Sequence, residues 1–305
     1  MKGYKSNMIT SVILLLFMAV LMFGVCQQTA FSQEAQGQLQ KTYMIKLKDG
    51  GTVTGVLVSE SATQIVIQST SMGTVTVSRT DIDSMTLLSS GDAEKGWFPN
   101  PNSSKYLIGS SAIAPEKGTG YYQNTWLFFN SFNYAFTDYF SLSGGFEIFS
   151  IFAKGDGPYA FYLNPKVSFN VAENLYLGGN ILYANTIKSI DEFGGLGTLN
   201  AFATYGNKNT NITTSFGWGF SEGEFSSKPL ITISGMIRAS RRIGFVSENW
   251  LIPGVGTDGS YYGMFSYGIR FMGDKISVDF AFINNPDIAE EIVIGIPFLD
   301  FVVNF

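Results

Sequence analysis

The sequence has no histidine and only one cysteine, Cys26, among its 305 residues. Without an imidazole, the chain cannot activate a serine or cysteine nucleophile in the usual way, and it cannot build a histidine metal site. Charged residues amount to only 14% of the chain. This is too few for a soluble β-sandwich, in which the outward face of each sheet is polar and charged. The composition therefore predicts neither an enzyme nor a cofactor-binding or metal-binding protein, and it argues against a soluble sandwich.

The N-terminus has the pattern of an export signal. Two lysines precede an apolar run over residues 8–25, and the small residues Ala30 and Ser32 follow it. We predict a signal peptide over residues 1–32 that is removed by cleavage. The alternative is a retained membrane helix, but a run of about 18 residues lies near the lower limit for crossing a bilayer.

Cys26 lies inside this predicted signal peptide. The residues before it, Phe23-Gly24-Val25, fit the pattern of a lipoprotein signal poorly, so we expect Cys26 to be discarded rather than lipidated. The mature chain then has no thiol and no disulfide. Signal removal also takes two of the 19 basic residues, which leaves 17 against 24 acidic residues and a net charge of −7. Such a chain is a poor candidate for binding nucleic acid.

Residues 41–89 predict a small domain of five short strands. Apolar and polar residues alternate here, and Asp49-Gly50-Gly51 fits a hairpin turn between the first two strands. The strands are expected at 43–48, 52–58, 64–68, 74–78 and 82–87. The Lys-Asp-Gly-Gly hairpin and the closing Asp-Ile-Asp segment make the stretch similar to SH3-like and Sm-like small β-barrels, some of which bind RNA. Because its charges cancel, we expect no nucleic acid here, but a spacer or adaptor that meets a periplasmic partner.

Residues 90–104 predict a linker between this domain and the rest of the chain. The stretch is polar and contains Pro99 and Pro101, which interrupt regular structure. Trp97 and Phe98 stand out in it, and either a membrane interface or packing against a neighbouring domain would accommodate them.

Residues 105–305 predict a large antiparallel barrel that crosses a membrane. The chain holds 27 Phe, 15 Tyr and 34 Gly, a composition suited to strands with aromatic girdles at a membrane interface. Twelve strands are expected, at 105–114, 120–135, 140–152, 159–171, 175–187, 195–205, 210–220, 230–239, 243–251, 261–272, 276–283 and 292–305. Tight turns alternate with longer loops, as in transmembrane barrels whose turns face the periplasm. The first and ninth strands alternate weakly, so ten strands remain an alternative. An even number of strands would put both ends of the barrel, and the small domain, on the turn side.

The charged residues of these strands fall on the polar phase of the alternation. They are Glu147, Lys166, Arg238, Arg270, Asp279 and Asp300. We predict that they line the lumen, because a Lys or Arg facing lipid at midplane costs about 2–4 kcal/mol. Asp279 and Asp300 are also candidates for an acid–base pair, but Arg270 favours an ion pair with Asp279 across the expected hairpin. Pro165 and Pro297 lie on the lipid phase of predicted strands and require a bulge or a strand end there.

The last expected strand ends on Phe305, and its apolar face includes Leu299, Phe301 and Val303. An apolar face that ends on a final aromatic residue resembles the closing strand and assembly signal of bacterial outer-membrane β-barrels. The resemblance implies an all-β chain, a transmembrane barrel of about twelve strands preceded by a small five-stranded domain. It also implies a location in the outer membrane of a Gram-negative cell, with the small domain in the periplasm. The partners would be the lipid bilayer and the barrel-assembly machinery, which would recognise Phe305 as its signal.

Two functions remain open for such a barrel. The first is a narrow passive pore or small-solute channel, whose selectivity the six charged residues would set. The second is a plugged, non-conducting barrel that serves as a structural or adhesive anchor, with the small domain binding periplasmic partners. No feature of the sequence identifies a solute.

Overall fold

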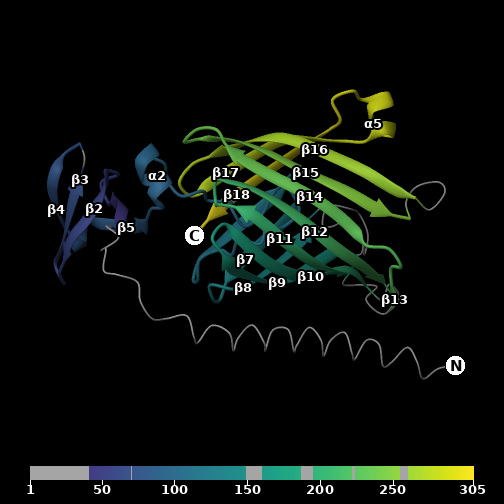
Figure 1. The fold of residues 1–305 in the computed structure, drawn as a ribbon, viewed down its shortest axis with the longest axis horizontal. Coiled ribbons are helices and arrows are strands. Elements are labelled where there is room, and N and C mark those ends of the chain that lie inside the picture. Colours follow the sequence, from purple (N-terminus) through teal and green to yellow (C-terminus); the bar gives the residue numbers. More distant parts are fainter. Residues whose placement is uncertain (1–40, 70, 149–159, 187–194, 222–223, 255–259) are drawn as a thin grey trace, which may run out of the picture. The chain divides into compact units, whose positions relative to one another are not determined.

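The computed structural model describes residues 41–305 except 70, 149–159, 187–194, 222–223 and 255–259. The predicted signal peptide over residues 1–32, with Cys26, lies outside the described residues. The described part of the chain forms two antiparallel sheets, one of five strands and one much larger (Figure 1). No helix within these residues is long and apolar enough to cross a membrane.

The first sheet contains the five strands expected over residues 41–89. They are β1 (Thr42–Leu47), β2 (Thr52–Glu60), β3 (Gln64–Ser69), β4 (Gly73–Ser78) and β5 (Ile82–Leu87), in the order β4-β3-β2-β1-β5. Ile45, Ile65 and Ile67 are fully buried on one face and form its core. A single 3-10 turn, η2 (Arg79–Asp81), precedes β5. The similarity to SH3-like and Sm-like modules reaches only as far as this small five-stranded sheet.

The expected linker begins with a short helix, α2 (Ser90–Lys95). The hydroxyl of Ser89 accepts a hydrogen bond from the backbone N–H of Asp92 at 3.2 Å, which caps the first turn. Gly96 ends the helix in the left-handed region, with φ of 63°.

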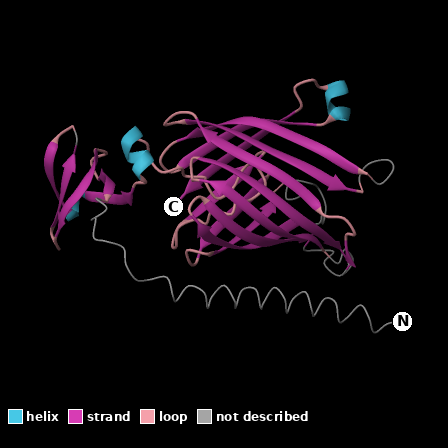
Figure 2. Ribbon diagram, viewed as in Figure 1, coloured by secondary structure: helices cyan, strands magenta, loops and turns pink. Residues whose placement is uncertain are grey.

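The second sheet is a closed barrel of twelve strands with a two-residue addition, β13 (Glu224–Phe225) (Figure 2). The twelve are β6 (Gly120–Thr125), β7 (Phe129–Ala135), β8 (Phe140–Glu147), β9 (Ala160–Ala172), β10 (Leu175–Thr186), β11 (Leu196–Gly206), β12 (Thr210–Ser221), β14 (Leu230–Arg238), β15 (Ile243–Pro253), β16 (Tyr261–Met272), β17 (Ile276–Asn284) and β18 (Ile296–Asn304). Each strand pairs antiparallel with its neighbour, β18 pairs with β6, and β11 pairs with β12. The sheet therefore has no free edge between these strands.

The predicted count of twelve strands is confirmed, but two of the expected ranges are wrong. One of them forms no strand, and the other forms two. Residues 105–114 form no strand, only an isolated bridge between Lys105 and Ser110. Residues 120–135 form two strands, β6 and β7, because the chain reverses after residue 125. Trp126 and Leu127 adopt φ of 51° and 66° there, a conformation that apolar side chains rarely accept. No glycine or asparagine marks this turn in the sequence, which is why the hairpin was read as one strand.

The connections differ in length at the two ends of the barrel, as expected. The end with the shorter connections has those at 136–139, 173–174, 207–209, 239–242 and 273–275. The opposite end carries the hairpin turn after β6 and the longer connections, one of which contains α5 (Pro286–Glu291). Residues 115–119, which separate the first two expected strands, lead into the start of β6 at the end with short connections.

The barrel closes where its first and last strands meet. Gly120 and Phe305 exchange two backbone hydrogen bonds of 2.9 Å each. A Cβ atom on Gly120 would lie 2.7 Å from the ring of Phe305, so a glycine is needed for this approach. The start of β6 and the C-terminus therefore share the end with short connections.

The two prolines on the lipid phase occupy weak points of the hydrogen-bond ladder. The β9–β10 pairing runs from Ala172 to Lys166 and resumes at Leu163, so Pro165 falls in the gap. Pro297 lies at the start of β18, ahead of Asp300, where pairing with β6 begins. A missing backbone N–H is tolerated at both places.

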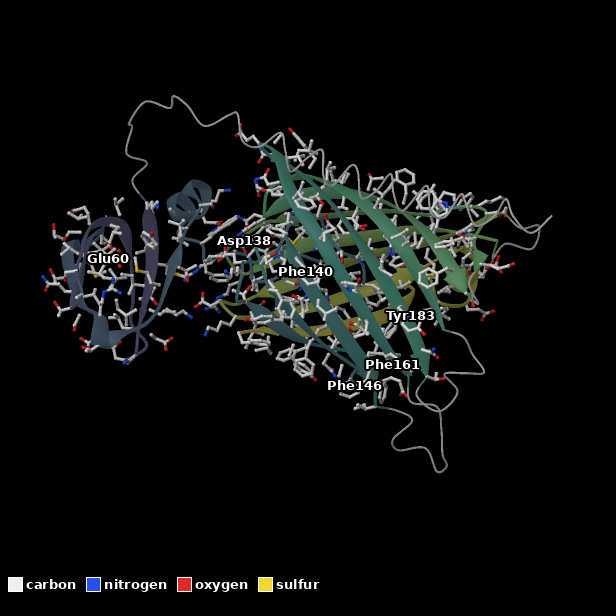
Figure 3. The ribbon with its side chains drawn as sticks, turned by 90° about the horizontal axis from the view of Figure 1, so that it is seen from below. Glu60, Asp138, Phe140, Phe146, Phe161 and Tyr183 are labelled. Carbon is white, nitrogen blue, oxygen red and sulfur yellow. The ribbon has the colours of Figure 1, made fainter. Side chains whose placement is uncertain are left out.

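The outer face of the barrel is a continuous apolar surface. Large side chains there are exposed, among them Phe216, Ile233, Phe245, Phe265, Phe271, Phe280 and Leu299. Figure 3 labels four more aromatic residues of outward-facing phase on β8, β9 and β10, namely Phe140, Phe146, Phe161 and Tyr183. A closed sheet with an apolar exterior pairs its ladder groups without water, which is what a bilayer requires. The chain is an outer-membrane type of β-barrel, in contact with lipid.

Placing a charge on this surface should destabilise the barrel according to depth. Ile233 lies in the middle of β14 and is 47% exposed, whereas Ile243 begins β15 at the end with short connections. Ile233→Arg should lower the free energy of unfolding in lipid vesicles by about 2–4 kcal/mol, and Ile243→Arg by about 0–1 kcal/mol. Urea titration of both variants measures this. Equal losses would show that residue 233 does not face hydrocarbon.

Candidate functional site: the occupied lumen

Residues 98–116 are here called the plug segment, and all but the exposed Glu116 end of it lies inside the barrel. Most of this stretch is buried, including Tyr106 and Leu107 at 1% exposure and Ile113 at 2%. Its hydrogen bonds reach side chains of β9, β11, β12, β15, β16, β17 and β18. A buried segment that touches so many strands of a closed barrel must occupy its lumen. The expected first strand, 105–114, is the centre of this plug.

Arg270 is the main link between the barrel wall and the plug segment. It is fully buried, and its Nε and Nη2 donate to Oδ1 and Oδ2 of Asp279 at 2.7 and 2.8 Å. The expected ion pair between these residues is therefore present, in the two-pronged geometry that arginine and a carboxylate favour. The same guanidinium donates to the carbonyl oxygens of Asn102 at 2.6 Å, Tyr106 at 2.8 Å and Lys105 at 3.3 Å.

Lys105 forms the second link, with Asp300 on β18. Its Nζ lies 3.0 Å from Oδ2 of Asp300, and both side chains are buried, at 5% and 0% exposure. The other carboxylate oxygen accepts from Gln123 Nε2 at 2.9 Å and from Thr125 Oγ1 at 2.8 Å. Asp300 is therefore paired and hydrogen-bonded on both oxygens, the condition under which a buried charge is stable.

Glu248 on β15 holds the tip of the plug segment. The chain reverses there, and Tyr106 donates its backbone N–H to the carbonyl of Gly109 at 2.9 Å. The carboxylate accepts from the backbone N–H groups of Leu107, Ile108 and Gly109 at 2.9–3.1 Å. A Cβ on Gly109 would lie 3.3 Å from this carboxylate, so the missing side chain allows the approach. Trp250 Nε1 also donates to it, at 2.8 Å.

A neutral network holds the plug segment against β11 and β12. The Tyr106 hydroxyl lies 2.6 Å from both Asn211 Oδ1 and Thr213 Oγ1. Thr213 in turn meets Thr204 at 2.6 Å, and Thr204 accepts from the backbone N–H of Ala112 at 2.7 Å. Burial raises the pKa of Tyr106, which lies outside the membrane-spanning strands, to about 12. The phenol therefore stays protonated and keeps its donor.

Lys166 on β9 is buried and bonded to the plug segment through carbonyl oxygens. Its Nζ donates to Ser104 at 3.0 Å and to Ile113 at 3.3 Å. It also borders a cavity of about 40 Å³ between the plug segment and strands β6 to β9. The lining residues are Ser104, Lys105, Ile108, Ser110, Pro115, Tyr121, Gln123, Asn133, Ser141, Ser143, Tyr162, Asn164 and Lys166.

The six charged residues expected in the lumen divide into three groups. Arg270, Asp279 and Lys166 lie around the plug segment as described, and so does Asp300. Arg238 is buried nearer the end of β14, where it donates to the carbonyl of Phe98 at 2.8 Å and stacks on that ring at 4.8 Å. Glu147 is half-buried at the end of β8.

The buried charges around residues 102–113 of the plug segment cancel. Three cations, Lys105, Lys166 and Arg270, face three anions, Glu248, Asp279 and Asp300, whereas Arg238 meets the plug segment at Phe98. The carboxylates of Asp279 and Asp300, the candidates for an acid–base pair, are both engaged in ion pairs and hydrogen bonds. In the part of the chain that the structure describes, no group of three His, Cys, Asp or Glu is placed to hold a metal ion.

Sequence reasoning missed several residues of this site. Glu248 was overlooked because Asn249 and Ser247 occupy the outward phase of β15 and blur its alternation. Thr204 and Thr213 carry no charge, so nothing in the pattern distinguished them from other inward threonines. Lys105 was read as part of a wall strand.

Comparison with known proteins adds little to this picture. No family model matches the chain, and no curated protein matches it. Among solved structures, the chain is similar to the NanC porin, with 6% identity and a TM-score of 0.38 over 61% of this chain and 97% of that one. It is also similar to OprD of Pseudomonas aeruginosa (12% identity, TM-score 0.31, 87% and 92% covered) and to OccK7 (OpdD) of the same organism (11%, 0.32, 83% and 68%). At these values the similarities carry no argument about what this chain does.

Removing the Lys105 charge should test the buried link to Asp300. Lys105→Met leaves an uncompensated buried carboxylate and should lower the free energy of unfolding by about 3–5 kcal/mol. Adding Asp300→Asn should recover part of this loss, because the unpaired charge is gone. The control is Lys208→Met, which breaks an exposed pair with Glu116 at 2.9 Å and should cost about 0–1 kcal/mol. Similar losses from both lysines, in urea titrations, would contradict a buried pair.

Proposed function

We propose that the chain is a narrow outer-membrane channel for small solutes, constricted by its own plug segment. The observation that carries the proposal is the cavity beside the plug segment, which is lined mainly by hydroxyl, amide and ammonium groups. A barrel that served only as an anchor has no need of a polar space within it, because apolar side chains fill small barrels at lower cost.

Selectivity then depends on only some of the six charged residues that the sequence predicts to line the lumen. Arg270, Asp279 and Asp300 hold the plug segment and are neutralised by their partners. Lys166 borders the cavity, and its contacts are carbonyl oxygens. Lys166 is therefore the residue of the six that most directly meets a passing solute, and Glu147 lies on the same inward phase of the wall toward the opposite end.

A second candidate, the non-conducting anchor, is favoured by one observation. The plug segment is bound by two buried charged links and by the Glu248 carboxylate, and such a network resists displacement. In that case the five-stranded sheet would bind a periplasmic partner and the barrel would only hold it at the membrane.

Orientation and assembly follow from the ends of the barrel. The chain enters β6 at the end with short connections, which face the periplasm in bacterial barrels. Residues 41–89 would then lie in the periplasm. Phe305 ends the outward phase of β18 and closes the seam with Gly120, which supports its role as the signal for the barrel-assembly machinery.

Planar-bilayer recording distinguishes the channel from the anchor. The intact protein should give small discrete current steps. Arg270→Ala should make the steps several-fold larger, because the carbonyls of Asn102 and Tyr106 lose their donor and the plug segment loosens. Arg242→Ala, an exposed arginine between β14 and β15, is the matched control and should leave the steps unchanged. An electrically silent protein, with and without Arg270, would favour the anchor.

Truncation of the terminal ring tests the assembly signal. Phe305→Ala should reduce the amount of folded barrel in the outer membrane several-fold, because the final aromatic residue is lost. Phe301→Ala is the control, since Phe301 is an outward aromatic of the same strand, 39% exposed, and is not terminal. Heat-dependent gel mobility of membrane fractions measures folded barrel. Equal losses would mean that Phe305 acts only through lipid contact.

A further inference from the structure

The plug segment does not meet all sides of the lumen in the same way. Most of its charged and hydroxyl anchors lie on β11, β12 and β15 to β18, through Thr204, Thr213, Glu248, Arg270 and Asp300, and Lys166 on β9 adds one more. Toward β6, β7 and β8 it borders the 40 Å³ cavity instead. The plug segment is therefore held on most sides of the barrel, with a space toward β6, β7 and β8.

Strands β6 to β9 form one wall of this space, and the plug segment forms the other. On β8 its lining begins at Ser141, next to the end with short connections, and continues to Ser143. At the other side of the plug segment it reaches Ile108, at the tip, which is 55% exposed. The cavity thus has on its lining both a residue near one end of the lumen and the exposed tip of the plug segment.

The wall of this space carries polar atoms that no protein group satisfies. The Oδ1 atoms of Asn133 and Asn164 are buried, and neither has a hydrogen-bond partner among the described residues. Both asparagines line the cavity, and Asn133 is only 4% exposed. Because buried amide oxygens are almost always hydrogen-bonded, these two are sites for water or a hydrated ion. A cavity of about 10–15 Å³ already suffices for one water molecule.

We infer that water and small inorganic ions cross the barrel along the wall formed by β6 to β9, while the plug segment stays in place. This inference rests on the proposed channel function and specifies its path. Passage along this wall leaves the contacts of Arg270, Lys105 and Glu248 with the plug intact. Passage by expulsion of the plug would break all of them, and would leave the wall carboxylates of Glu248 and Asp300 and the ammonium group of Lys166 without the plug groups that bond them.

Silver ions and single cysteines can locate the path. Ser143→Cys puts a thiol on the cavity wall, and Ser234→Cys puts one on the inward face of β14, paired with Thr213 and Glu248. Ser234 is 4% exposed and lies beside two residues that hold the plug segment. Silver replaces the thiol proton, which passes to the solvent, and leaves a bulkier S–Ag group. Currents are carried by potassium nitrate, so that silver stays in solution.

We expect silver to remove most of the current through Ser143→Cys and to leave Ser234→Cys and the unsubstituted chain unchanged. Loss of current in both variants would show that the plug segment leaves the lumen. That result would overturn the proposed path along the wall but not the proposed channel function. Current that persists in both would place the path elsewhere and also overturn it. Absence of current from every form, including the unsubstituted chain, would overturn the channel itself. Heat-dependent gel mobility identifies folded variants before recording, and Asn133→Cys replaces Ser143→Cys if the latter does not fold.

Discussion

The whole structure depends on one constraint, that backbone N–H and C=O groups facing hydrocarbon have no water to bond. A sheet meets this constraint only by closing, and here β18 pairs with β6 and β11 with β12. Closure places one face of every strand against lipid and the other face toward the lumen. The outward phase carries Phe, Ile and Leu, and the inward phase carries the Ser, Thr, Asn and charged residues that lipid would reject.

Closure also creates the problem that the plug segment solves. A barrel of twelve strands encloses charged side chains in a space with little water, where an unpaired charge is costly. Residues 98–116 bring one ammonium group, a set of carbonyl oxygens and three turn N–H groups into that space. These groups complement Asp300, Arg270 and Glu248 respectively. The interior is thus a polar core assembled from wall and plug together, and a small cavity remains where the two do not meet.

The strand boundaries were predictable because period-two alternation and lipid exposure act on the same residues. Ten of the twelve expected strands coincide with strands of the barrel to within a few residues, and residues 149–152 of the expected strand 140–152 lie outside the described residues. The hairpin at Trp126 and Leu127 was missed since its turn residues are apolar and take an unusual backbone conformation. Residues 105–114 were misread since a polar segment inside a barrel and a weak wall strand share the same mixture of polar and apolar side chains.

The sequence alone determined the class of fold, the lipid-facing phase and the inward direction of the charged residues, because these depend on local periodicity. It also predicted the ion pair of Arg270 with Asp279, since one hairpin brings them together. Only the tertiary structure decided which groups the inward charges meet. Lys105 and Asp300 are separated by 195 positions, and Leu107 and Glu248 by 141. Contacts of that range arise from barrel closure around the plug segment, and no local pattern encodes them.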